Sequence, residues 1–218
     1  MRTQIAGAGL LILAGILSSC SESPNRNGIR SATTVLTPIR QPPTGSQLRG
    51  AALDGGDVHK GWTLINPSLA VTAAASGCGA RLESLPSPVG SATVEYRDPE
   101  NALPVLTETL ASFQQNQATS RYQNLVDTLN TCTNPDFHVG SATVSAKVAH
   151  SGPLDLGVEN QAYAAELTAP GTNLHLGLDV FEDGTVVGCV GYTTPASTTT
   201  TALEEYAKRA VGKLETLS

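Results

Sequence analysis

The stretch of residues 173–192 decides the fold and reads NLHLGLDVFEDGTVVGCVGY. Apolar side chains alternate with small or polar ones through its first half, which is the pattern of a β-strand with one apolar face. Those apolar residues are Leu174, Leu176, Leu178 and Val180. The dipeptide Asp183-Gly184 is typical of a tight turn between two strands. Residues 185–192 are apolar on both faces, so the stretch predicts a hairpin whose second strand lies in the middle of a sheet.

Four further segments have the character of strands. Residues 91–97 (SATVEYR) and 142–148 (ATVSAKV) alternate between two kinds of side chain, as half-buried strands do. Residues 161–168 (QAYAAELT) are compatible with a strand. Residues 104–113 (PVLTETLASF) are dominated by Val, Leu and Thr, which favours a strand, and a helix is the alternative for this segment.

Two apolar stripes have helical spacing. The first is expected to begin after Asn116 as the N-cap and to end near Cys132, because Thr-Asn-Pro follows. It consists of Ala118, Tyr122, Leu125, Val126, Leu129 and Cys132. The second follows a capping-box pattern, Thr201-x-x-Glu204. It consists of Leu203, Tyr206, Ala207, Ala210, Val211, Leu214 and Leu217. Residues 46–56 predict a short helix broken by two glycines.

The order of these elements predicts an α+β fold, an antiparallel β-sheet flanked by helices on one face, as a single domain over residues 46–218. Of the 218 residues, 4% are aromatic, so the core must be built largely from Val, Leu and Ala. The net charge is −6, and a nucleic-acid-binding surface would normally be basic. We therefore expect no nucleic-acid partner.

The N-terminus has a different character from the rest of the chain. Arg2 precedes an apolar run, residues 5–17, which has the length of a signal-peptide core. Leu17-Ser18-Ser19-Cys20 resembles a bacterial lipobox. That resemblance implies a lipoprotein signal peptide over residues 1–19, cleavage before Cys20, and diacylglycerol and palmitate-type acyl chains on Cys20. The alternative is a buried N-terminal helix, which no capping signal or apolar stripe supports.

Several acyl chains on Cys20 would hold the chain stably at the outer face of the cell membrane. Residues 20–45 are then expected to form a flexible tether, because they are rich in Pro, Ser, Thr and Asn and have little apolar periodicity. A flexible coil of that length spans roughly 28 Å, by the square-root dependence on chain length. The folded domain is expected to be extracytoplasmic, where disulfides form readily.

The mature chain resembles the extracellular PknH-like sensor domains of actinobacterial lipoproteins and receptor kinases. The resemblance lies in the order of several short segments and covers most of the mature chain. These segments are GGDVHKGWTL (55–64), CGARL (78–82), the helix that ends at Cys132, DLGVENQAY (155–163), GCV (188–190) and the final amphipathic helix. The resemblance implies a sheet with flanking helices and a cleft that binds a ligand. This chain departs from the receptor kinases in having no kinase domain, and from their four-cysteine pattern.

Three cysteines remain once Cys20 is assigned to the lipid anchor. They allow one bridge and one further thiol, and their spacing alone leaves the pairing open. Cys78 and Cys132 lie at expected helix ends, and the resemblance implies a bridge between similar positions, so we expect a Cys78–Cys132 disulfide. Cys189 lies in the apolar strand and is expected to be a small buried hydrophobe.

The sequence contains no motif of a known catalytic or cofactor site. No carboxylate pair is expected to point inward, the segment PDFH (135–138) is expected to be a loop, and the histidines are too far apart to form a local metal motif. We expect no enzyme, no cofactor and no metal. The expected function is ligand sensing or binding, with a small molecule, lipid or glycan near Trp62, Tyr96 and Tyr122. The alternative is a cell-envelope interaction protein that binds another protein or a glycan through its surface.

Overall fold

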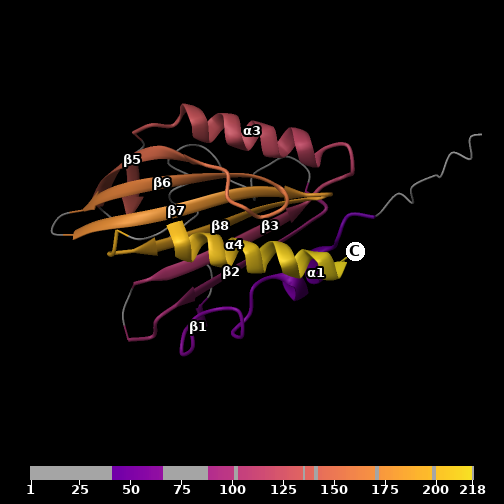
Figure 1. The fold of residues 1–218 in the computed structure, drawn as a ribbon, viewed down its shortest axis with the longest axis horizontal. Helices are drawn as coiled ribbons and strands as arrows, with labels where there is room; N and C mark the ends of the chain where they lie inside the picture. Colours follow the sequence, from indigo (N-terminus) through magenta and orange to yellow (C-terminus); the bar gives the residue numbers. More distant parts are fainter. Residues whose placement is uncertain are drawn as a thin grey trace, which may run out of the picture. The chain divides into compact units, whose positions relative to one another are not determined.

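The computed structural model describes residues 41–65, 88–100, 103–134, 136–139, 142–169, 172–197 and 200–217. All of them belong to the compact unit Pro38–Ser218. Their strands form one antiparallel sheet in the order β1-β2-β3-β8-β7-β6-β5-β4 (Figure 1). The strands are β1 (Thr63–Ile65), β2 (Gly90–Arg97), β3 (Val105–Ser112), β4 (Asp136–Val139), β5 (Ala142–Gly152), β6 (Glu159–Ala169), β7 (Thr172–Asp183) and β8 (Val186–Thr194). The helices are α1 (Gly45–Ala51), α3 (Ala118–Thr131), α4 (Thr200–Leu214) and the short 3₁₀ turn η1 (Glu215–Leu217).

The predicted hairpin is present and forms the centre of the sheet. β7 and β8 pair from Asp183 opposite Val186 to His175 opposite Thr194. The turn consists of Gly184 and Thr185, one residue later than expected, and Gly184 has a φ of +61° that favours glycine. β8 lies between β3 and β7, so its predicted central position is confirmed.

Helices cover both faces of the sheet, and the prediction that they lie on one face was wrong. On one face, Tyr122 and Leu125 of α3 pack with Leu178 of β7. On the other, α1 and α4 pack over residues such as Phe181 and Val190 (Figure 1). The physical reason is that the central strands are apolar on both faces, so each face needs a covering layer. The α+β fold class is confirmed.

The ambiguous segment 104–113 forms strand β3, in which all eight residues are buried. The predicted strands at residues 91–97, 142–148 and 161–168 correspond to β2, β5 and β6. The expected loop at residues 135–138 was wrong, because Asp136–Val139 pairs with β5 as the edge strand β4. Its short length and single neighbouring strand left little pattern to recognise.

The ends of the helices differ from their predicted caps. α3 is preceded by Gln117 rather than Asn116 as the N-cap, because Arg121 N donates to the carbonyl of Gln117 at 3.0 Å. Its end at the Cys132 C-cap is confirmed. α4 begins at Thr200, so Thr201 lies inside the helix and is not the N-cap of a capping box.

A capping box does occur on α1, between Thr44 and Gln47. This helix lies against β2, where a Cβ on Gly90 would come within 2.3 Å of the backbone nitrogen of Gly45. Ser112 Oγ of β3 donates to the carbonyl of Pro43 at 2.5 Å. Pro43 and Thr44 were assigned to the end of the tether, and both contact the domain.

Candidate ligand-binding site

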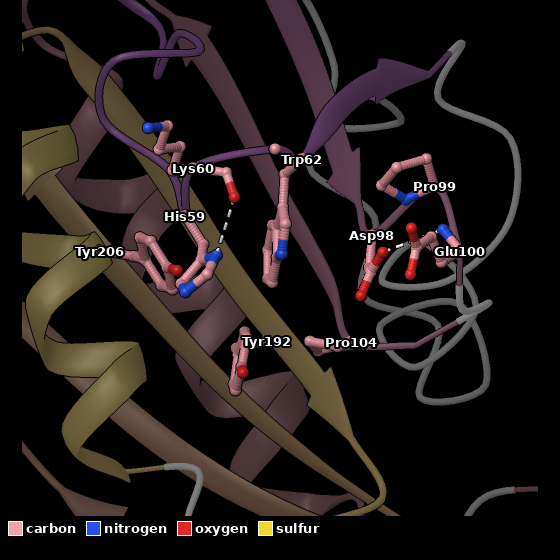
Figure 2. Close-up of a pocket in the computed structure, with 10 residues that line it drawn as sticks. His59, Lys60, Trp62, Asp98, Pro99, Glu100, Pro104, Tyr192 and Tyr206 are labelled. Carbon is pink, nitrogen blue, oxygen red and sulfur yellow. Dashed lines mark hydrogen bonds between the residues drawn. The ribbon is translucent and has the colours of Figure 1, made fainter.

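A pocket of about 460 Å³ opens beside Trp62 (Figure 2). Its walls come from the segment between α1 and β1, the connection from β2 to β3, the end of β8, and α4. The lining residues are His59, Lys60, Gly61, Trp62, Asp98, Pro99, Glu100, Pro104, Tyr192 and Tyr206. The volume lies within the range of small-molecule sites, roughly 300–1,000 Å³.

Three aromatic rings from different parts of the chain meet at this pocket. The rings of Trp62 and Tyr192 lie within 8° of parallel, with centroids 6.3 Å apart. Tyr206 of α4 lies 6.3 Å from Trp62 and 5.8 Å from Tyr192, between ring centroids. Tyr206 is buried, whereas Trp62 and Tyr192 are half-buried. Trp62 and Tyr192 therefore present more of their surface to the pocket than Tyr206, which packs against both of them.

Polar groups stand around the same opening. Asp98 Oδ1 accepts a hydrogen bond from the backbone N–H of Glu100 at 2.9 Å, which orients the carboxylate. Lys60 and Glu100 are exposed, and His59 Nδ1 donates to the carbonyl of Lys60 at 3.1 Å. Figure 2 shows Asp98 on the opposite side of the opening from Trp62. The pocket thus combines an aromatic wall with two carboxylates and one ammonium group.

The segment that carries Lys60 and Trp62 is fixed to the sheet through Leu53. The backbone N–H of Leu53 donates to Glu108 Oε2 at 2.6 Å, and its carbonyl accepts from the hydroxyl of Tyr96 at 3.2 Å. Both bonds are buried, so they hold the start of the segment against β2 and β3.

The same segment is fixed to α4 by charged side chains. Lys213 Nζ lies 2.7 Å from Asp54 Oδ2 and 2.6 Å from Asp57 Oδ2. Arg209 donates to the carbonyl of Asp57, and its guanidinium also lies 5.7 Å from the centre of the Tyr206 ring. The hydrogen bond from Lys213 lowers the pKa of Asp54, which keeps the pair ionised. Movement of α4 would therefore carry the pocket segment with it.

Three carboxyl groups are buried in the sheet, contrary to the expectation that none would point inward. Besides Glu95, which is 4% exposed, Glu108 is 1% exposed and Asp179 is 0% exposed. Burial raises the pKa of Glu108 to about 7 and that of Asp179 to about 8. Among the described residues, Asp179 has no hydrogen-bond partner on either carboxyl oxygen. None of the three residues lines the pocket.

Only a partial signal for Glu108 and Asp179 is present in the sequence. Glu108 shares its strand face with Leu106 and Leu110, so an acidic side chain stands in an apolar row. Asp179 lies on the face of β7 opposite its row of Leu side chains. The alternation of the strand predicts that this face is exposed to solvent. It is buried because α4 covers it, which the strand pattern alone does not reveal.

The structure does not bring the three predicted aromatic residues together. Trp62 lines the pocket. Tyr96 is buried in the core beneath α1 and α4, and Tyr122 is buried in the core beneath α3, on the opposite face of the sheet. Sequence reasoning missed Tyr192 and Tyr206, which lie far from Trp62 along the chain. The only sequence signal for these two residues was that Tyr192 lies in an apolar strand and Tyr206 lies in the apolar stripe of a helix.

Cys132 is disulfide-bonded and lies at the C-terminal end of α3. Cys78 lies outside the described residues, so the Cys78–Cys132 pairing stays a prediction. Cys189 is 8% exposed and packs in the core beneath α3, as expected for a small hydrophobe. Cys20 and the predicted signal peptide also lie outside the described residues.

Within the described ranges, no group of three His, Cys, Asp or Glu side chains could hold a metal ion. None of the helices in those ranges is both long and apolar enough to cross a bilayer.

Comparison with known proteins places the fold. No protein-family model matches the sequence, and no curated protein matches it significantly. The fold is similar to that of the extracellular domain of PknH from Mycobacterium tuberculosis. The TM-score is 0.65, with 13% sequence identity, over 81% of this chain and 98% of the PknH domain. At that identity the likeness concerns the fold alone, and it agrees with the resemblance drawn from the sequence.

Proposed function

We propose that this chain is a membrane-anchored extracytoplasmic lipoprotein whose domain binds a small ligand and acts as a sensing or binding module. The observation that carries the proposal is the pocket, in which Trp62 and Tyr192 face Asp98 and other polar groups. Pockets that combine aromatic side chains with a few placed polar groups are typical of ligand sites. The lipobox at Cys20 and the likeness to an extracellular domain support the location.

We assign no catalytic role to the domain. Catalysis would need a general acid or base within reach of a bound substrate. Glu108 and Asp179 have raised pKa values but do not line the pocket. The pocket carboxylate Glu100 is exposed to solvent. The arrangement favours binding over proton transfer.

The alternative, an interaction protein that works through its surface, receives less support. Among the described residues, the exposed large apolar side chains are Leu64 and Val89, at 56% and 43% exposure. Leu64 pairs with Tyr96 near the end of β2, whereas Val89 precedes the start of that strand. Single, separated apolar residues are normal on a monomer and do not form a docking patch.

Membrane attachment is tested by a Cys20→Ala substitution in the full chain, expressed in an actinobacterial host. We expect the wild type in the membrane fraction with an acylated N-terminal peptide, and the variant without acylation. Cys189→Ala is the matched control and should remain acylated. A wild-type chain that carries no acyl group would contradict the anchor.

Ligand binding is tested through the fluorescence of Trp62, which is the only tryptophan in the chain. Small molecules extracted from the host envelope should change its emission in a saturable way. A Tyr192→Leu variant, which removes the adjacent ring but keeps an apolar side chain, should lose the change. No response in the wild type, or an equal response in the variant, would contradict ligand binding at this pocket.

A further inference from the structure

We infer that the pocket takes a saccharide, with one pyranose ring lying against the wall of Trp62 and Tyr192. Its hydroxyl groups would then donate hydrogen bonds to the carboxylates of Asp98 and Glu100. The inference rests on the proposed ligand-binding function and adds the chemical class of the ligand.

The aromatic wall has the shape that a sugar ring requires. Because the planes of Trp62 and Tyr192 are within 8° of parallel and their centroids lie 6.3 Å apart, the two rings present neighbouring flat faces in the same direction. Figure 2 shows the two rings one after the other, both nearly edge-on, with the opening beside them. An aromatic face carries partial negative charge, so it attracts the C–H groups on the apolar face of a pyranose. A flat, half-buried wall therefore suits a ring that has one apolar face.

The polar groups of the pocket suit the hydroxyl groups at the edge of a pyranose ring. Sugar hydroxyls both donate and accept hydrogen bonds, and ionised carboxylates accept several. Asp98 and Glu100 supply acceptors across the opening from Trp62. Bonds to charged groups are about twice as strong as neutral ones, so a few can orient a neutral ligand. The backbone bond from Glu100 to Asp98 fixes one of these acceptors in advance.

Other ligand classes fit these residues less well. An anionic ligand such as a phosphate would meet two carboxylates against one lysine. A quaternary ammonium ligand needs rings that enclose it, whereas the rings of Trp62 and Tyr192 are nearly parallel. Tyr206, the third ring that lines the pocket, is 8% exposed, and Arg209 already lies against it. A purely apolar ligand would leave the charged groups of the opening without a role.

The test is a titration of Trp62 fluorescence in the purified full-length lipoprotein in detergent. The probes are methyl glycosides of glucose, mannose, galactose and N-acetylglucosamine, with tetramethylammonium chloride and inorganic phosphate for comparison. We expect at least one glycoside to give a saturable change with half-saturation at about 1–10 mM, the range for one stacked ring and a few hydrogen bonds. Asp98→Asn should weaken that binding about tenfold through loss of a charge-assisted bond. Asp155→Asn, an exposed carboxylate on another loop, should leave it unchanged.

Each other outcome overturns the inference in a recognisable way. A response to tetramethylammonium or phosphate alone leaves ligand binding in place and excludes the saccharide. A response to envelope extract but to none of the glycosides does the same. No response to extract or to any probe removes the proposed function as well. Glycoside binding that Asp98→Asn does not weaken excludes the assigned contacts.

Discussion

Glu108 of β3 and Asp179 of β7 both lie directly opposite Val190 of β8. The two carboxyl groups therefore occupy one row across the sheet, on the face covered by α1 and α4. With neighbouring strands about 4.8 Å apart, their Cα atoms are separated by about 10 Å. Two carboxyl groups at such depth are stable only when they are protonated or well bonded.

We expect the stability of the domain to fall as the pH rises from about 4 to about 8. Burial raises the pKa of Asp179 from 3.8 to about 8, so the folded state keeps its proton through this window while the unfolded state releases it. The free energy of unfolding therefore decreases with pH and is highest below pH 4, as far as Asp179 is concerned. The loss should be on the order of a few kcal/mol, with Glu108 contributing in the same direction.

Urea denaturation at pH 5, 6, 7 and 8 measures this slope. An Asp179→Asn variant, which cannot ionise, should have a shallower dependence on pH than the wild type. Asp155→Asn removes an exposed carboxylate and should keep the wild-type slope. Parallel slopes for wild type and Asp179→Asn would show that Asp179 is not buried with its proton.

Position 188 requires glycine because the ring of Phe181 lies directly against it. A Cβ at this position would lie 2.1 Å from Phe181 Cζ, on the neighbouring strand, in a fully buried contact. Gly188→Ala should therefore cost about 1–3 kcal/mol of stability through overpacking. Gly212→Ala is the matched control, since its Cβ would meet no neighbouring atom and it lies in α4. It should be neutral or stabilise the helix by up to about 1 kcal/mol. Equal effects of the two substitutions would be inconsistent with the packing at Phe181.

Lys213 should contribute more to the stability of the domain than Lys208, although both lie on α4 and form ion pairs. The Lys213 side chain is 22% exposed and bonds to two carboxylates of the pocket segment, whereas Lys208 is 48% exposed and pairs within the helix. Lys213→Met should cost about 1 kcal/mol, after allowance for screening at the exposed Asp54. Lys208→Met should change stability little.

Hydrogen exchange gives a second readout of the same contact. Amides of residues 53–62 should exchange faster in Lys213→Met and at the wild-type rate in Lys208→Met, because Lys213 joins this segment to α4. Unchanged exchange in Lys213→Met would show that the bonds of Leu53 and Arg209 hold the segment without Lys213.

The sheet and the main helices were predictable because their signals are local. The alternation in β7 and the stripe of α3 each lie within one short window of sequence. The covering of both faces was not predictable in the same way. Asp179 and its neighbours on that face looked like a solvent side, and only the placement of α4 buries them.

The pocket was even less predictable from local sequence patterns than the covering of the sheet. Trp62 is predicted as an aromatic residue and as the only tryptophan in the sequence. Tyr192 and Tyr206 come to it through sheet pairing and helix packing, which no local pattern reports. Tyr96 and Tyr122 were chosen by residue type, and the fold places them in two separate cores.

Native mass spectrometry of the protein purified from its own host tests whether this pocket holds a small ligand. We expect a bound mass on the wild type, in steps that match sugar residues. The bound mass should be absent from a Tyr192→Leu variant with an unchanged circular dichroism spectrum. A wild-type protein without such a bound mass, or a variant that keeps the same bound mass, would contradict ligand binding in this pocket.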